Sequence, residues 1–388
     1  MGHRSPLVAA VTAVVALGAA VGPALPATAQ PSVAVAGDSI GDESRTAVRN
    51  AVEPSHRIVW YVTRDSATIG KLGPALLEEV ARPDGPDIVL VELGAGNAFW
   101  GTGEEDFRRQ VHDLTAGLLA HATCVRWFEQ KPGGNLAYPS INRRAVHFNR
   151  ILRDVIDDFA RARTVHYEAW TRLAGDGVFR RDLLHLNPRG QRGLARLARQ
   201  AVAGCDPALT TGPFWDVADR HWAAAAINDA GNRHYIDGYA NGTFRAEVGG
   251  IVTTLDRLDW VRALWRRAGR PTGHPPAPWP DADGAGHDAL GWAAAEAVVT
   301  LPGDAPFRPA APAARADAIQ WLYRAAGRPD PSGYPPHGLT DVPPALTRAV
   351  RWAKGTGIVT VPDGGAFLPL RSLTRAEAAV FLYRADHP

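Results

Sequence analysis

The stretch VAVAGDSIGDES, residues 33–44, decides the class of the fold. An apolar run of small and β-branched residues comes first, and Gly37-Asp38-Ser39 follows it. Such a run is typical of a buried strand. Ser39 is then either a nucleophile presented at a strand end or a polar residue that closes the strand. The stretch alone does not distinguish these two interpretations, so the rest of the chain must supply the partners that a nucleophile needs.

The remainder of residues 31–204 alternates between strand and helix patterns. Helices are expected at residues 105–120 and 141–162, where apolar residues recur at three- and four-residue spacing. Asn187 and Pro188 suit the N-cap and first position of a last helix that runs to about residue 203. Short apolar runs predict strands at residues 32–36, 57–62, 87–93, 123–128 and 164–168. This alternation predicts a three-layer α/β/α, flavodoxin-like fold around a parallel sheet.

Composition and the first residues indicate an exported chain. The formal net charge of the 388 residues is only +2, so no nucleic-acid partner is indicated. His3 and Arg4 precede an apolar segment, residues 7–22, and Ala27-Thr28-Ala29 forms a small-x-small cleavage site. Residues 1–29 are therefore predicted to be a signal peptide. No segment approaches the roughly 20 apolar residues of a membrane-spanning helix.

The two cysteines, Cys124 and Cys205, are either buried free thiols or a disulfide. Export makes a disulfide chemically permissible, and we favour the bridge. It would join a central strand to the end of the last helix of the first domain.

A nucleophilic serine needs a base, a group that orients the base, and donors for the oxyanion. His185 and Asp182 stand out because they precede the capped helix in RDLLHLNPRG, residues 181–190. They are either an acid and a base in a solvated loop or the partners of Ser39. The serine follows the first strand and the pair follows the last one, so all three are expected at one edge of the sheet.

With these motifs, residues 31–205 resemble the SGNH hydrolases, also called GDSL esterases and lipases. The resemblance implies that Ser39 is the nucleophile, His185 the base and acid, and Asp182 the orienting group, with no metal or cofactor. It also implies an oxyanion hole made by the Ser39 backbone, a glycine N–H and an asparagine. Ser66 stands where the family has that glycine, with Gly70 and Gly73 as alternatives.

Asn97 is the candidate asparagine, and its alternative role is that of a turn residue. The family usually shows Gly-x-Asn-Asp, whereas this chain reads Gly94-Ala-Gly-Asn97-Ala98. The spacing is one residue longer and the trailing aspartate is missing.

Beyond a turn-rich linker, residues 206–213, the chain repeats itself about every 60 residues. Each unit ends in an Arg-x-acid element that leads to an aromatic residue followed by arginine, and these elements begin at Arg257, Arg315 and Arg375. The units resemble S-layer homology (SLH) domains, and we place them at residues 214–272, 279–329 and 338–388, forming a mostly helical region.

The SLH resemblance implies non-covalent binding of secondary cell-wall polysaccharide. Arg257, Arg315 and Arg375 match the family element's arginine, and guanidinium donors suit anionic sugar groups. The alternative is that these arginines pair with nearby acids within the fold. Together the two regions predict an exported, cell-wall-anchored serine esterase or lipase, with O-acetylated wall polysaccharide as one candidate substrate. A catalytically inactive hydrolase-like domain in a structural wall-binding protein is the other hypothesis.

Overall fold

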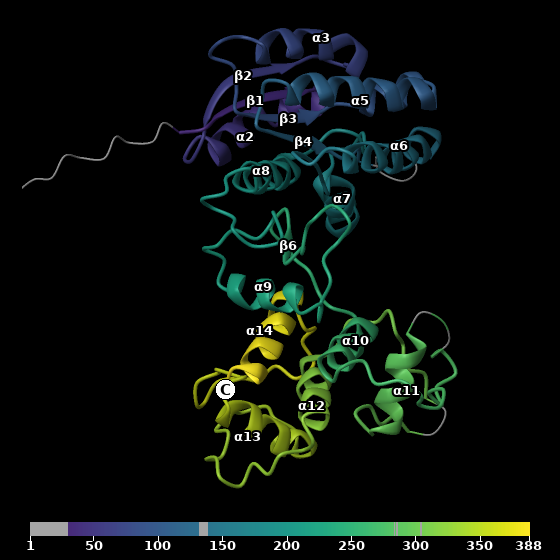
Figure 1. Ribbon diagram of the computed structural model, residues 1–388, viewed down its shortest axis with the longest axis vertical. Helices are drawn as coiled ribbons and strands as arrows, with labels where there is room; N and C mark the ends of the chain where they lie inside the picture. The colour runs from purple at the N-terminus through teal and green to yellow at the C-terminus, as the bar shows by residue number, and fades with distance from the viewer. Residues whose placement is uncertain (1–29, 132–138, 283, 285, 303–304) are drawn as a thin grey trace, which may run out of the picture. The chain divides into compact units, whose positions relative to one another are not determined.

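The computed structural model describes residues 30–131, 139–282, 284, 286–302 and 305–388. Residues Pro31–Pro388 form one compact unit (Figure 1). The predicted signal peptide, residues 1–29, lies outside the described residues, and the domain limits given above stay predictions.

The first half of the unit is built on one five-stranded sheet in the order β2-β1-β3-β4-β5, with every neighbouring pair parallel. The strands are β1 (Ser32–Gly37), β2 (Arg57–Thr63), β3 (Ile88–Glu92), β4 (Cys124–Phe128) and β5 (Ala162–Val165). This order is that of flavodoxin-like folds, in which ligands bind at the carboxyl ends of the strands. The predicted fold class is confirmed.

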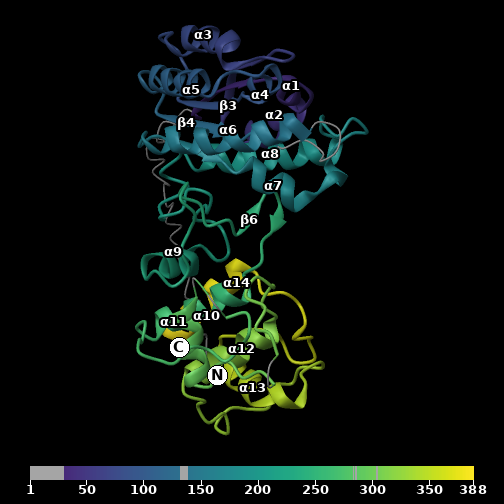
Figure 2. The same ribbon diagram turned by 90° about the vertical axis from the view of Figure 1, so that its right-hand side faces the viewer.

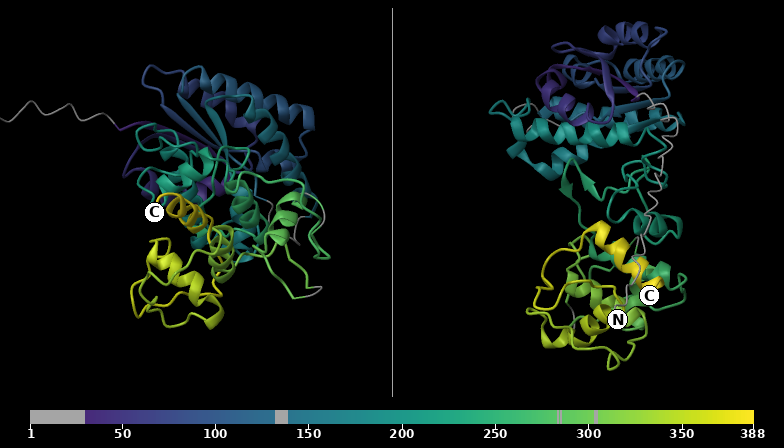
Figure 3. Two further views of the ribbon diagram at one scale, coloured as in Figure 1. Left: turned by 60° about the horizontal axis from the view of Figure 1, so that its bottom comes forward. Right: turned by 90° about the vertical axis from the view of Figure 1, so that its left-hand side faces the viewer.

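Helices cover both faces of this sheet (Figures 1 and 3). Val33 and Val35 of β1 face the core beneath one helix layer, and Ala34 and Ala36 face the other. The first layer contains α2 (Arg45–Val52) and α8 (Pro188–Ala203). The second contains α3 (Ile69–Val80), α5 (Glu104–Leu119) and α6 (Pro139–Asp157). Shorter elements are α1 (Ser39–Glu43), α4 (Ala95–Trp100), α7 (Tyr167–Ala174) and the 3-10 turn η1 (Asp176–Val178).

The fifth strand and its flanking helices differ from the sequence prediction. The helix predicted to reach residue 162 ends at Asp157, and β5 begins at Ala162 because Ala162–Val165 pair with Val125–Phe128 of β4. The strand predicted to reach residue 168 stops at Val165. The carbonyl of His166 already accepts the amide of Trp170, so helical hydrogen bonding of α7 has begun there.

Cys124 and Cys205 form a disulfide, with their Cα atoms 5.8 Å apart. It joins the first residue of β4 to the segment just after α8. The predicted bridge is therefore confirmed, and it closes a long loop of the chain that would otherwise be free in the unfolded state.

The second half of the unit is mostly helical, as predicted. Its last helix packs against its first (Figure 2). The elements are α9 (Ala224–Asn232), β6 (Glu247–Val248), β7 (Ile251–Val252), α10 (Arg257–Arg267), α11 (His287–Ala295), α12 (Arg315–Ala325), η2 (Pro344–Leu346), α13 (Thr347–Gly355) and α14 (Arg375–Asp386). Within the described part of the chain, no helix has the length and apolar character needed to cross a membrane.

Candidate active site

Ser39 is the first residue of α1 and follows β1 through a tightly held turn. The Asp38 side chain caps α1 by accepting the amide of Ile40 at 2.9 Å. A Cβ added at Gly37 would lie 3.0 Å from Oε2 of the buried Glu92, and one at Gly41 would lie 3.1 Å from it. Small residues on both sides of Ser39 therefore let the turn close over the end of β3, and this places Ser39 at the carboxyl edge of the sheet.

His185 and Asp182 lie in the loop between η1 and α8, and they meet Ser39 there. Nε2 of His185 lies 3.2 Å from the Ser39 Oγ, and Nδ1 of His185 lies 2.8 Å from Oδ2 of Asp182. The proton assignment that satisfies both contacts has Nδ1–H donating to Asp182 and Nε2 accepting from the hydroxyl. The structure thus brings together three side chains that the sequence analysis selected from distant positions.

The backbone of this loop holds Asp182 in place. Oδ1 of Asp182 accepts the amides of Leu184 and His185, both at 2.9 Å. Leu183 between them has a φ of 53°, in the left-handed region that an L-residue seldom adopts. The left-handed turn at Leu183 lets the Asp182 carboxylate reach the imidazole of His185, three residues later.

The hydrogen bonds of Asp182 also set its ionisation. Its partial burial by itself raises the pKa, but the bonds from the His185 side chain and from the two amides outweigh that effect and lower the pKa of Asp182 to about 2. The carboxylate is therefore ionised at neutral pH and can stabilise a positively charged imidazole.

The Asn97 side chain is hydrogen-bonded within the fold. It is fully buried at the start of α4, and its Oδ1 accepts the amide of Ile69 at 2.9 Å. Its Nδ2 donates to Oγ1 of Thr102 and to Oε1 of Gln110. Both amide protons are used inside the protein, so the predicted oxyanion role of Asn97 conflicts with its position. The side chain instead ties the first residue of α3 to Thr102 and to α5.

Gly96, the residue before Asn97, packs directly against the β2–α3 loop. A Cβ added at Gly96 would lie 2.1 Å from the carbonyl oxygen of Ala67, so no side chain fits there. Ser66, the other predicted oxyanion residue, is exposed in the β2–α3 loop with a φ of 52°. Gly70 and Gly73 lie within α3. No hydrogen bond connects Ser66 with Ser39, and the role of Ser66 stays a prediction.

Lys131 is a site residue that the sequence analysis missed. It follows β4 at the carboxyl edge, its side chain is buried, and its Nζ has no hydrogen-bond partner among the described residues. Burial lowers the pKa of Lys131 to about 8, while the charges of Asp38 and Glu92 counteract that effect. The available signal was its rarity, because the chain has only three lysines.

The three C-terminal units interlock in a ring. The amide of Leu255 donates to the carbonyl of Leu373, that of Leu373 to Ala313, and that of Ala313 to Leu255. In each unit a carboxylate accepts two successive amides: Asp216 those of Phe244 and Arg245, Asp281 those of Phe307 and Arg308, and Asp341 those of Phe367 and Leu368. The sequence repeat therefore corresponds to a repeated structure.

The arginines of the Arg-x-acid elements lie at the joints of this ring. Nε of Arg257 donates to the Phe307 carbonyl, Nε of Arg315 to the Phe367 carbonyl, and Nε of Arg375 to the Phe244 carbonyl. Arg257 is also paired with Asp317, and Arg315 with Glu377 at 2.8 Å. These two arginines are neutralised inside the fold, which is the structural alternative raised by the sequence.

Arg375 differs from the other two. Its Nη2 donates to the Asp237 carbonyl at 2.9 Å, and among the described residues no carboxylate is ion-paired with it. It lines a pocket of about 180 Å³ together with Tyr239, Asp259 and Arg266. Of the three predicted polymer-binding arginines, Arg375 is thus the one that combines a pocket position with the lack of a carboxylate partner among the described residues.

Comparison with known proteins identifies part of the C-terminal half. The S-layer homology domain family matches residues 339–379, which lie in the third unit. No curated protein sequence matches the chain.

Several solved structures are similar to part of the chain. A lipase/acylhydrolase from Enterococcus faecalis has 15% identity over 44% of this chain and 95% of its own, with a TM-score of 0.40. An acetyl xylan esterase from Geobacillus stearothermophilus has 13% identity over 44% and 93%, with a TM-score of 0.35. The catalytic domain of Streptococcus pneumoniae peptidoglycan O-acetyltransferase A has 14% identity over 46% and 92%, with a TM-score of 0.36. These values are too low to transfer an activity.

Proposed function

We propose that the protein is an exported serine esterase that hydrolyses carboxylic esters and is held at the cell wall by its C-terminal units. One observation carries the catalytic part: the Ser39 hydroxyl, the His185 imidazole and the Asp182 carboxylate are hydrogen-bonded in series, at 3.2 and 2.8 Å. A base that is within reach of a hydroxyl and is itself oriented by a carboxylate is the arrangement that activates a serine.

In the proposed reaction, Oγ of Ser39 attacks the ester carbonyl while Nε2 of His185 takes the hydroxyl proton. Asp182 stabilises the resulting imidazolium. The imidazolium then protonates the departing alkoxide, and an acyl-Ser39 ester remains. A water molecule attacks this ester with His185 again acting as base, which releases the acid and restores the free serine.

The oxyanion donors are the part of the site that supports an alternative to an active esterase. The Ser39 amide lies at the start of α1, where amides lack intrahelical partners, and we assign it as one donor. The buried, internally bonded Asn97 supplies none. Loss of one such donor typically costs a hundredfold or more in rate. This observation favours a second candidate, a hydrolase-like domain without activity.

Fluorophosphonate labelling and ester hydrolysis separate the two candidates. An active protein is expected to be labelled at Ser39 and to release 4-nitrophenol from its acetate ester, and the Ser39→Ala variant should do neither. Absence of labelling in the folded wild-type protein would establish the inactive alternative. Hydrolysis that persists in Ser39→Ala would exclude the assigned nucleophile. Rates on a panel of acetyl to palmitoyl esters would then define the acyl preference.

We further propose that all three units are SLH domains and that they bind anionic wall polysaccharide through the Arg375 pocket. The family match in the third unit and the repeated Asp and Arg contacts in the other two support this. Anchoring at the wall would bring an O-acetylated wall polysaccharide to Ser39.

Co-sedimentation with purified cell walls tests the anchor. Tyr239 is 42% exposed and lines the Arg375 pocket, so Tyr239→Ala should reduce the wall-bound fraction. Trp222→Ala is the matched control, because Trp222 is an exposed aromatic residue that lines a different pocket. Equal binding by wild type and Tyr239→Ala, or a loss only in Trp222→Ala, would contradict the assignment to the Arg375 pocket.

A further inference from the structure

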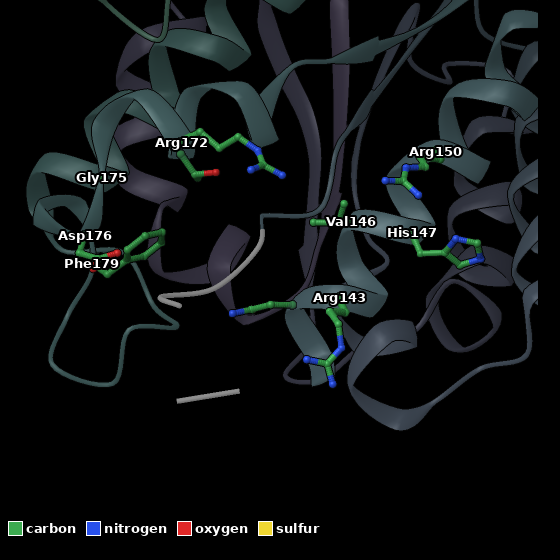
Figure 4. Close-up of a pocket in the computed structure, with 10 residues that line it drawn as sticks. Arg143, Val146, His147, Arg150, Arg172, Gly175, Asp176 and Phe179 are labelled. Carbon is green, nitrogen blue, oxygen red and sulfur yellow. The ribbon is translucent and has the colours of Figure 1, made fainter. Parts of the chain in front are cut away.

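A pocket of about 700 Å³ between α6 and α7 is lined by basic side chains (Figure 4). Arg143, His147 and Arg150 follow one another at four- and three-residue spacing, so they share one face of α6. Arg172 comes from α7, and its guanidinium group and that of Arg150 reach toward the space between the two helices. The pocket therefore concentrates cationic groups from two separate elements.

Two of these cations have no partner in the part of the chain that the structure describes. Arg172 binds Glu168 through Nε and Nη2, and His147 contacts Glu104 at 3.0 Å. For Arg143 and Arg150, no ion pair or hydrogen bond connects the guanidinium group to any described residue. The lining includes one carboxylate, Asp176. An unneutralised pair of guanidinium groups is suited to carboxylate or phosphate oxygens.

The pocket adjoins the Ser39 site through Phe179. The Phe179 ring lines the pocket, and Nζ of Lys131 lies 4.4 Å from the centre of that ring. The backbone of Phe179 forms an antiparallel β-bridge with Leu186, the residue after His185. The amide of the neighbouring Arg180 donates to the His185 carbonyl at 2.8 Å. A ligand in the pocket would thus lie beside the loop that carries His185. At the boundary lies the buried Lys131 ammonium group, which has no hydrogen-bond partner among the described residues.

Exposed aromatic residues lie on α4, which is bonded to the same N-terminal half of α6. Phe99 and Trp100 of α4 are 45% and 60% exposed, and their rings meet edge to face at 5.0 Å. Arg144 of α6 donates to the Ala98 carbonyl at 2.8 Å, which fixes α4 beside α6. Exposed aromatic faces next to a cationic pocket suit a ligand that has apolar ring faces and negative charges.

We propose that the pocket between α6 and α7 is an anion subsite and that the substrate is an acidic, O-acylated polysaccharide. Its carboxylate or phosphate groups bind Arg143 and Arg150, sugar rings lie against Phe99 and Trp100, and an ester on the same chain reaches Ser39. This inference rests on the proposed esterase function and adds the charge of the substrate to it.

Acetate release from three acetylated polymers with one backbone tests the charge preference: dextran, carboxymethyl dextran and dextran phosphate. We expect kcat/KM to be about tenfold higher or more for an anionic polymer, since charge-assisted hydrogen bonds are worth about 1.4 kcal/mol or more in total. The carboxymethyl and phosphate polymers distinguish the two sources of negative charge. The preference should shrink as salt is raised from 0.05 to about 0.5 M.

The Arg143→Gln/Arg150→Gln variant should lower the ratio of anionic to neutral kcat/KM by about tenfold. The Arg57→Gln/Arg192→Gln variant removes the same charge from exposed positions outside the pocket and should keep the wild-type ratio. Equal rates on all three polymers, or an equal change in both variants, would overturn the subsite while leaving the esterase intact. Absence of hydrolysis of every polymer and of 4-nitrophenyl acetate would instead refute the esterase proposal.

Discussion

At the start of α1, the Ser39 hydroxyl is half-buried and contacts a base from a distant loop, whereas at the start of α12 the Arg315 guanidinium is buried and bonded within the fold. Both side chains stand on the first residue of a helix that follows an extended segment. In the α/β region the partners converge on an open sheet edge, where a substrate can enter. In the repeat region they converge on the joint between two units. The same local feature therefore serves a reaction in one region and assembly in the other.

The largest expected effect is on catalysis in the α/β region. Ser39→Ala should lower kcat/KM for 4-nitrophenyl acetate by at least about a thousandfold, because the attacking oxygen is lost. Its thermal unfolding midpoint should stay near that of the wild type, since among the described residues the Ser39 hydroxyl is hydrogen-bonded to His185 alone. A variant that loses stability along with activity would show that Ser39 is structural, as Arg315 is.

The corresponding change in the repeat region should act on stability. Arg315→Met removes the donor to the Phe367 carbonyl and one of the two ion-pair partners of Glu377, the other being Arg371. Removing one partner of a buried pair typically costs about 3–5 kcal/mol. Denaturant unfolding would measure the loss. Arg150→Gln is the control, because an exposed arginine without a partner should change the free energy of unfolding by less than about 0.5 kcal/mol. Equal stability of the two variants would remove the contrast between the regions.

The disulfide offers a test of smaller size. The α/β region has a covalent link between β4 and the end of α8, whereas hydrogen bonds join the three units. The Cys124→Ala/Cys205→Ala variant should lose about 2–4 kcal/mol of stability, because the unfolded chain regains loop freedom. Hydrogen exchange should locate the loss in the sheet and α8. An equal loss of protection in α10, α12 and α14 would mean that the two regions unfold together.

The smallest expected effect is a pH dependence. Burial, as the main cause, raises the pKa of Asp38 to about 6, and it does the same for Asp216 in the first repeat unit. A folded carboxyl that keeps its proton to about pH 6 stabilises the protein fully below the unfolded pKa of about 4, and this contribution is lost as the pH rises through 6. Asp38→Asn and Asp216→Asn should each flatten the fall in stability between pH 4 and 6 in thermal melts. If the unfolding midpoint of either variant decreased between pH 4 and 6 as steeply as that of wild type, these pKa shifts would be contradicted.

Much of the α/β region follows from local sequence patterns. The buried apolar strand before Ser39, the Asn187-Pro188 start of α8, and the gathering of Ser39, Asp182 and His185 at one edge of the sheet were all predicted. The parallel order of the strands then brings those ends to one edge. The predicted end of the fifth strand was wrong by about three residues. Pairing with β4, and not the local run of apolar residues, decides where this strand stops.

The sequence by itself determined which residue types stand at the strand ends and that three similar units follow. Only the tertiary structure decided which way their side chains face. Asn97 turns inward because Gln110 and Thr102 take its amide protons, and Arg257 and Arg315 face internal acids on other units. Lys131 became a site residue because β4 ends beside Asp38 and Glu92. The physical reason is that a polar side chain is oriented by its hydrogen-bonding and ionic partners, and these partners come from remote parts of the chain.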